Sequence, residues 1–289
     1  MRTFFFRCAL ICAIAALTTA CSEENDSKEE FKISAIVAPL TRAPQLNENG
    51  EGKFTNGDQN TLFFFTNDTK PISTFLYTYG HTYFWNDLKL PTNETEFTLT
   101  GCYPPVKEVT GSNILWNASI DNAQNELLFS APQKVQKGAT ANIPLTFKHV
   151  LHKICIELVT DKTSITDEME KDARIECRNV LPIAHISLKE GRSTNASGIK
   201  TSFSYAGKKA YFVIPPQQTG NIEIGIHINQ KEFNYRLSEK LINGNPLQEL
   251  KEGFALTIKI AVSNESFSIL GQEINAWEEQ GEITDSIIF

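Results

Sequence analysis

Residues 254–262 read Phe-Ala-Leu-Thr-Ile-Lys-Ile-Ala-Val, in which a large apolar side chain occupies every second position from Phe254 to Val262. Successive side chains of a β-strand point to opposite faces of its sheet, so this stretch predicts a strand with one face in a core and one in water. Residues 222–228 repeat the pattern with isoleucine at every even position. Two such strands predict a sheet that is covered on one face.

Short runs of the same kind fill most of the remaining sequence. Turn residues separate them, as in Asn56-Gly57-Asp58, and no segment sustains a helical period with caps. Many short strands with a turn about every ten residues are typical of antiparallel sandwiches, so we predict an all-β protein of two tandem β-sandwiches. Further strands are expected at residues 62–65, 75–79, 83–85, 96–100, 211–214 and 266–270.

The apolar positions change phase within residues 145–159. They are odd-numbered up to Phe147 and even-numbered from Val150 onward. One extra residue near His149 would produce this shift, which predicts a β-bulge in a single long strand.

A polar and charged run at residues 160–172 follows that strand, and one short helical turn fits it. We place the boundary between the two domains there. The expected N-terminal sandwich is 45–160 and the expected C-terminal sandwich is 161–289.

Residues 1–20 are organised like a secretory signal peptide. Arg2 and Arg7 flank the start of a short apolar run, and a small residue precedes Cys21. The run is too short to span a bilayer. Cleavage before Cys21 would make it the lipid attachment site of a bacterial lipoprotein held at a membrane surface by acyl chains such as palmitate. An ordinary signal peptide is the alternative, because Thr18 stands three residues before Cys21, where a lipoprotein signal usually has an aliphatic residue.

Residues 21–44 are expected to be an acidic tether followed by a strand. The stretch 21–30 is polar and acidic, so it cannot pack into a core. In 31–37, a strand would place Phe31, Ile33, Ala35 and Val37 on one face.

The composition restricts the classes of partner. Hydrophobic residues make up 41% of the 289 and aromatics 10%, with 19 phenylalanines, which excludes a disordered tail or a collagen. The formal net charge is −7 at pH 7, which argues against binding a phosphate backbone. We therefore expect no nucleic-acid partner.

Signatures of catalysis are missing from the sequence. It contains neither a dinucleotide-binding glycine pattern, nor a P-loop, nor a Gly-x-Ser-x-Gly elbow. His149 and His152 would point to opposite faces of a strand, so they could share a metal ion only if the predicted bulge realigned them. The expectation is therefore no enzymatic activity, no metal and no cofactor. Beyond Cys21, the folded part keeps Cys102, Cys155 and Cys177, an odd set in which one disulfide is an open possibility.

Other polar and aromatic residues allow more than one interpretation. His227 lies on the polar face of its predicted strand, where a solvated side chain is expected. Trp85, Trp116 and Trp277 could stack on sugars, but large aromatics beside strand patterns are more often core residues.

A series of short motifs runs along the sequence. They are Thr41-Arg42-Ala43, Phe54 to Asp58 before strand 62–65, an aromatic hairpin through Trp85, and residues 97–105, 126–131, 145–149, 214–217 and 274–277. In this order they resemble the fimbrillin family, the subunits and accessory proteins of type V pili on Gram-negative anaerobes. The resemblance implies two transthyretin-like β-sandwich domains, lipoprotein export and a role in surface filaments at the outer membrane.

In pilins of this family, cleavage after an arginine removes the leader strand and opens a groove for a strand of the next subunit. Here the resemblance implies cleavage between Arg42 and Ala43, which follow 31–37 in a proline-flanked segment that should be extended and accessible. An unprocessed subunit, with Arg42 in a plain loop, stays open as the alternative.

The end of the sequence offers a donor strand. Ile283, Ile287 and Phe289 would share one face, interrupted by Asp285. An edge strand folded back on its own domain fits the same pattern.

These features predict a fimbrillin-like surface lipoprotein, a structural or accessory pilus subunit that assembles by strand exchange. Its expected partners are other pilus subunits, the outer membrane through its lipid and, for an adhesive subunit, a host or bacterial surface ligand. The alternative is a monomeric glycan-binding surface lipoprotein that uses aromatics near Trp85 or Trp116.

Overall fold

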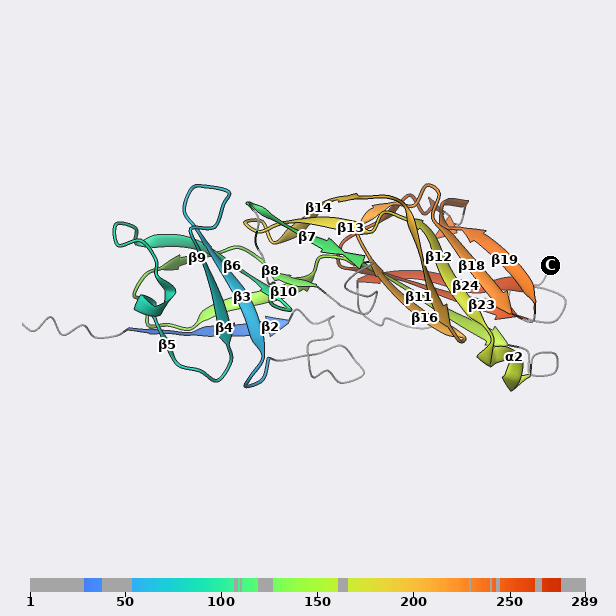
Figure 1. Ribbon diagram of the computed structural model, residues 1–289, viewed down its shortest axis with the longest axis horizontal. Coiled ribbons are helices and arrows are strands. Elements are labelled where there is room, and N and C mark those ends of the chain that lie inside the picture. The colour runs from blue at the N-terminus through green and yellow to red at the C-terminus, as the bar shows by residue number, and fades with distance from the viewer. Residues whose placement is uncertain are drawn as a thin grey trace, which may run out of the picture.

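The computed structural model describes residues 29–37, 54–106, 109, 111–118, 127–160, 166–228, 230–239, 241–242, 245–262 and 267–276. Strands dominate these ranges, so the predicted all-β sandwich class is confirmed (Figure 1). No helix in this part of the chain is long and apolar enough to cross a membrane.

A seven-stranded sheet and a small two-stranded sheet enclose the first core. The large sheet has the order β2-β10-β8-β6-β3-β4, with β9 also on β6, and β1 pairs with β5 in the small one. Phe64, Leu99, Leu145 and Phe147 are among the buried side chains between them. The elements are β1 (Glu30–Phe31), β2 (Ile33–Val37), β3 (Gln59–Phe65), β4 (Ser73–Thr78), β5 (Tyr83–Phe84), the 3-10 helix η1 (Trp85–Leu88), β6 (Glu96–Tyr103), β8 (Leu128–Ser130), β9 (Gln133–Gln136) and β10 (Ile143–His149).

Two four-stranded sheets enclose the second core, at the right of Figure 1. Their orders are β16-β11-β23-β24 and β15-β12-β18-β19. Both strands that decide the fold are present, and the isoleucines of β18 point into this core as the alternation predicts. The strands are β11 (His152–Thr160), β12 (Arg174–Val180), β15 (Thr201–Ala206), β16 (Lys209–Ile214), β18 (Glu223–Ile228), β19 (Lys231–Arg236), β23 (Phe254–Val262) and β24 (Phe267–Ala276).

Short elements complete this part of the chain. The predicted helical turn is α2 (Asp167–Lys171), where the Thr166 side chain accepts a hydrogen bond from the Met169 amide as an N-cap. The others are β17 (Gln217–Gln218) paired with β22 (Glu249–Leu250), η2 (Leu237–Glu239), and β20 (Leu241–Ile242) paired with β21 (Asn245–Pro246).

A third sheet lies between the two groups of strands in Figure 1. It has the order β14-β13-β7 and consists of β7 (Asn113–Asn117), β13 (Ile183–Ser187) and β14 (Arg192–Ser197). A third core packs beneath it and combines Phe63 and Phe129 of the seven-stranded sheet with Ile186 of β13 and Val213 of β16. The sheet and its core therefore join strands from distant parts of the sequence.

The predicted β-bulge near His149 is wrong. β10 ends at His149 in the seven-stranded sheet, and β11 begins at His152 and pairs with β16 and β23. Val150 and Leu151 lie between the two strands, buried in the third core. The apolar phase changes because the chain passes from one sheet to another. β11 thus joins later strands although it precedes residue 160, and the division into domains stays a prediction.

The tip of the β13–β14 hairpin contacts the seven-stranded sheet through hydrogen bonds and close packing. The Thr100 hydroxyl donates to the Leu188 carbonyl at 2.6 Å. Lys189 Nζ donates to the backbone carbonyls of Asn67 and Asp68, each at 2.9 Å. Gly191 lies so close to this sheet that a Cβ atom would stand 2.4 Å from the Ser130 carbonyl oxygen. We call residues 188–191 the hairpin tip.

Candidate functional site

The predicted leader strand lies in the structure as two short strands that face different partners. β1 pairs antiparallel with β5, and β2 pairs parallel with β10, from Ile33 opposite Ile143 to Val37 opposite Phe147. The crossover residue Lys32 accepts a hydrogen bond from the Ile143 amide at 2.9 Å. Residues 30–37 therefore connect β5 to β10, and we call the place that they occupy the leader groove.

Phe31 occupies an aromatic cage at one end of the leader groove. Its ring centroid lies 5.0 Å from that of Trp85 and 6.1 Å from those of Phe64 and Tyr77, with Trp85 and Tyr77 edge-on. Trp85 is fixed in turn by its Nε1–H, which donates to the Ala139 carbonyl at 3.1 Å. Phe31 is 1% exposed, and its ring is the largest buried side chain that the leader contributes to the first core.

The alternation predicted for the leader is confirmed. Phe31, Ile33 and Val37 are buried and Ala35 is half-buried on the same face. On the other face, Ile36 is 54% exposed. The leader thus adds an apolar face to the first core while its other face meets solvent.

Phe54 covers the opposite end of the groove. Its ring stacks on Tyr79 at 4.9 Å and meets Tyr103 and Phe147 edge-on at 5.4 and 5.1 Å. Phe147 is the residue that pairs with Val37, where β2 ends. Since Phe54 follows the predicted cleavage point in the sequence, it would stay in the groove of a processed chain.

The other predicted site residues lie outside the described residues. They are the lipid attachment residue Cys21, the cleavage residues Arg42 and Ala43, and the donor residues Ile283, Ile287 and Phe289. Their roles stay predictions.

Sequence reasoning missed the residues that line the groove. Tyr77, Trp85 and Phe54 come from three different segments, and only the fold brings them to the leader. A signal did exist, because the stretch 75–85 is unusually rich in aromatic residues. The periodicity could not say which strand those rings would cover.

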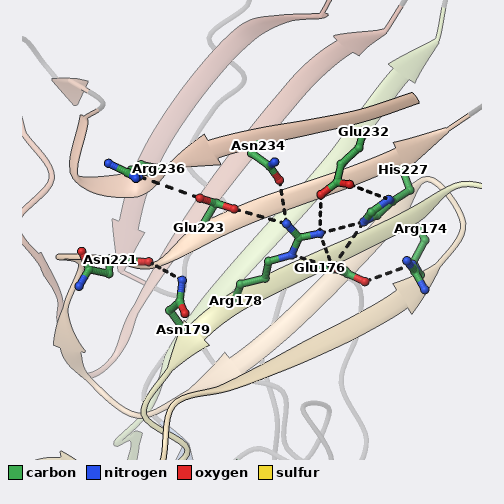
Figure 2. Close-up of polar contacts among 10 residues, drawn as sticks. All are labelled: Arg174, Glu176, Arg178, Asn179, Asn221, Glu223, His227, Glu232, Asn234 and Arg236. Atoms are coloured by element: carbon green, nitrogen blue, oxygen red, sulfur yellow. Dashed lines mark hydrogen bonds and ion pairs between the residues drawn. The ribbon is translucent and has the colours of Figure 1, made fainter. Parts of the chain in front are cut away.

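A second cluster of polar residues lies on the outer face of β12, β18 and β19 (Figure 2). Its centre is Arg178, which donates from Nε to Glu176 at 2.7 Å, from Nη1 to Asn234 at 2.9 Å, and from Nη2 to Glu232 at 2.9 Å. Further donors reach Glu223 at 3.4 Å and His227 at 3.0 Å. All five N–H groups of the guanidinium therefore have acceptors from the protein itself.

The hydrogen bonds and ion pairs of Arg178 connect side chains of β12, β18 and β19. Burial alone would raise the pKa of Glu176, but the hydrogen bonds and charge of Arg178 hold it below its usual value. Gly225 makes room for this contact, since a Cβ there would stand 2.7 Å from Arg178 Cζ. The expectation of a solvated His227 is therefore only partly right, because its Nε2 accepts from Arg178. The cluster stabilises the sheet.

His149 and His152 flank the crossover from β10 to β11, and both are buried. Burial lowers the pKa of His152 to about 4, against the opposing effect of its hydrogen bond with the Lys251 carbonyl at 2.8 Å. Burial, together with the charge of Lys153, also lowers the pKa of His149 well below its usual value. His149 is the last residue of β10, and His152 is the first residue of β11, which belongs to a different sheet.

Acid should therefore destabilise the fold. Between the unfolded pKa of about 6.5 and the folded pKa of about 4, the unfolded chain binds more protons at residue 152, so stability falls as the pH falls. From pH 7 to pH 4 we expect His152 to cost on the order of 3 kcal/mol of unfolding free energy. Urea unfolding at several pH values measures this. His152→Gln should flatten the profile, whereas the exposed control His81→Gln should not; equal profiles for both variants would contradict the assignment.

The surroundings of the three cysteines, Trp85 and Trp116 indicate structural roles. Within the described residues, Cys102, Cys155 and Cys177 form no disulfide, and burial raises the pKa of the Cys102 and Cys177 thiols to about 12. In the same ranges, no group of His, Cys, Asp and Glu side chains could hold a metal ion. Trp85 and Trp116 are 3% and 7% exposed, so neither presents its ring to a sugar.

Comparison with known proteins relates the chain to one family. Residues 41–277 match the family described as fimbrillin-like. The matched region begins just after β2. No curated protein matches the sequence.

Solved structures share the fold at low identity. A candidate cell adhesion protein of Bacteroides uniformis is 15% identical with a TM-score of 0.65, over 86% of this chain and 98% of that one. Another from Bacteroides ovatus is 14% identical with a TM-score of 0.60, over 88% and 99%. The tip fimbrial protein Mfa3 of Porphyromonas gingivalis is 10% identical with a TM-score of 0.50, over 86% and 99%.

Proposed function

Because this chain belongs to the fimbrillin-like family, we propose that it is a structural or accessory subunit of a surface fimbria and assembles by strand exchange. The observation that carries the proposal is the leader groove. The leader supplies a row of buried side chains to the first core, yet β2 is an edge strand of the seven-stranded sheet and precedes Arg42 in the sequence. A segment in that position can leave without breaking the order of the remaining strands.

The first step of the proposed assembly is cleavage between Arg42 and Ala43. Loss of the leader would uncover the places of Phe31, Ile33 and Val37. At ~1.5–3 kcal/mol for each large apolar side chain, gross burial on the order of 5–9 kcal/mol becomes available to a replacement strand. The freed edge of β10 would also offer unpaired backbone donors and acceptors.

The second step is insertion of a strand from a neighbouring copy. The segment 283–289 has the apolar spacing for this role, with Ile283, Ile287 and Phe289 on one face. In this proposal neighbouring subunits are the main partners, and adhesion to a host or bacterial surface is a further role of a terminal subunit.

An arginine-specific protease should convert the purified full chain into an assembling form. We expect one early cut after Arg42, a new N-terminus at Ala43 and the appearance of oligomers in size-exclusion chromatography. Arg42→Gln should abolish the cut and the oligomers. The control Arg192→Gln removes an exposed arginine that lies in a strand, and it should change neither. A cut chain that stays monomeric would refute the strand-exchange proposal.

Export as a lipoprotein is the proposed route to the outer membrane. Cys21→Ala removes the thiol that would carry the lipid, so we expect the variant to move from the membrane fraction to the soluble fraction. Membrane fractionation followed by immunodetection measures this, with Cys155→Ala as the matched control. Unchanged fractionation of Cys21→Ala would contradict lipid attachment at this residue.

A further inference from the structure

The seven-stranded, small and third sheets form one part of the structure, and the two four-stranded sheets form a second part. We propose that the polar joint between these parts is an acid-sensitive hinge, which opens at low pH while the first and second cores stay packed. The joint consists of the crossover 149–152, the turn 251–253 and Ser193 of β14. The proposal depends neither on strand exchange nor on the leader.

The two parts can separate without breaking the first or the second core. These cores share no residue. Within the described residues, the chain passes between the parts only at 150–151, 181–182 and 198–200. The third core lies at this boundary and includes Val213 of β16 together with Val150 and Leu151 of the crossover. Burial of these apolar side chains favours the closed joint at neutral pH.

The turn 251–253 binds the crossover directly. The Gly253 amide donates to the Leu151 carbonyl at 2.9 Å, and a Cβ on Gly253 would stand 3.4 Å from the His149 carbonyl oxygen. His152 Nδ1 lies 2.8 Å from the Lys251 carbonyl oxygen. Since a carbonyl oxygen only accepts, the proton of the neutral imidazole is on Nδ1. The joint therefore needs His152 as a neutral donor.

The same turn also binds the third sheet. The Glu252 carboxylate accepts a hydrogen bond from the Ser193 amide at 2.9 Å. Ser193 lies in β14, at an edge of the order β14-β13-β7. One turn of the second part thus contacts both the crossover and the third sheet. These bonds join separate elements, so their loss removes no strand from its sheet.

A second proton on His152 has no acceptor in the closed joint. His152 is 1% exposed, and its Nε2 has no hydrogen-bond partner among the described residues. Protonation would place a charged N–H group in these buried surroundings, which is costly. Burial accordingly lowers the pKa of His152 to about 4. In an open joint water reaches Nε2, so the open form binds this proton at a higher pH than the closed form.

The charged groups around the joint do not compensate a protonated imidazole. The charge of Lys153 acts with burial to lower the pKa of His149. β16 places Ile214 opposite His152 and so brings no charge there. Four cations stand against one carboxylate in the elements of the joint: Lys148 of β10, Lys153 of β11, Lys251 and Glu252 of the turn, and Arg192 of β14.

Glu252 acts in the opposite direction to the histidines. Burial raises the pKa of its carboxyl, against the Ser193 amide and the charges of Arg192 and Lys148. The closed joint therefore takes up this proton at a higher pH than the open joint, which favours closure in acid. Glu252 is only half-buried, whereas His149 and His152 are 4% and 1% exposed. The two imidazoles therefore outweigh the single carboxyl, and acid opens the joint.

Hydrogen exchange of the full chain, measured by NMR at pH 7 and pH 5, tests the hinge. His152 alone should increase the open population about 20-fold between these pH values, from a pKa of about 6.5 when open and about 4 when closed. The protection factors of the Gly253 and Ser193 amides should fall at least by this factor. At pH 5 they should also lie about 100-fold or more below those of amides within β3 and β12, which exchange only on global unfolding.

Each outcome of this measurement decides the proposal. Equal protection of the joint and of β3 and β12 at pH 5 would mean that the structure opens only as a whole, which overturns the hinge. Low protection at the joint that does not change between pH 7 and pH 5 overturns the acid trigger. Both comparisons use the parent chain and need no variant.

Variants of the joint test which group carries the effect. His152→Asn keeps a side-chain N–H near the Lys251 carbonyl but gains no charge, so the loss of protection between pH 7 and pH 5 should become about 20-fold smaller. The matched control His185→Asn changes a half-buried histidine of β13 and should leave the loss within about threefold of the parent. Equal losses for the two variants would overturn His152 as the trigger.

Glu252→Gln tests the sign of the charge balance independently. Glutamine still accepts from the Ser193 amide but removes the proton that favours closure in acid. The loss of protection at Gly253 between pH 7 and pH 5 should therefore become at least about twofold larger than in the parent chain. A smaller loss would overturn the assignment of opposite roles to Glu252 and the histidines.

Discussion

Phe31→Ala in the uncleaved chain is expected to lower the free energy of unfolding by about 3–5 kcal/mol, the usual cost of removing a buried phenylalanine ring. The ring touches Phe64, Tyr77 and Trp85, and the cage that it leaves is held by other contacts, so it should not collapse. Guanidinium unfolding, followed by tryptophan fluorescence, measures the loss, because Trp85 reports directly on the cage.

Ile36→Ala is the matched control for the Phe31 variant. It truncates an apolar side chain of the same leader, but Ile36 is 54% exposed, so the change should stay within about 0.5 kcal/mol. Equal losses for the two variants would mean that the cage does not anchor the leader. The same pair predicts kinetics, since a cleaved leader without Phe31 should dissociate sooner and let oligomers form faster.

Gly191→Ala should be about as damaging, by about 3–5 kcal/mol. Two costs combine, because Gly191 has a φ of +61° and its Cβ would stand 2.4 Å from the Ser130 carbonyl oxygen. The hairpin tip must then withdraw from the seven-stranded sheet, which weakens the contacts of Leu188 and Lys189 as well. Chemical unfolding gives the energy, and hydrogen exchange of the 66–68 amides shows whether the tip has moved.

Gly111→Ala isolates the contact from the backbone strain. Gly111 also has a positive φ, +76°, but a Cβ there would have nothing within 4 Å. Its substitution should cost only about 1–2 kcal/mol. If both glycine variants lose the same stability, the close approach to Ser130 carries no energy and the hairpin tip does not hold the sheets together.

The third core joins the seven-stranded sheet to strands that follow it in the sequence. Phe63 and Phe129 point from the seven-stranded sheet into the same core as Ile186 and Val213. Packed side chains thus connect the seven-stranded sheet with β13 and β16, and the hairpin tip adds contacts between β13–β14 and the seven-stranded sheet.

Local patterns predicted much of the fold correctly. The strand 254–262 and the isoleucine strand in 222–228 follow from alternation alone, because a half-buried strand must alternate. The inward face of the leader followed for the same reason. The phase change near His149 was detected but misread, since periodicity shows that a face changes and not which sheet the next strand joins.

The sequence by itself determined the class of fold, the strands with clear alternation, the apolar face of 31–37 and the resemblance to one family. Only the tertiary structure decided that Phe31 sits in a cage of three distant aromatic rings, that β2 runs parallel to β10, and that β7 and β13 share a sheet. The physical reason is the separation along the sequence over which each feature is decided. Alternation is imposed on each strand by the backbone and its immediate solvent boundary, whereas strand partners and ring contacts depend on segments tens of residues away whose choice minimises the free energy of the whole chain.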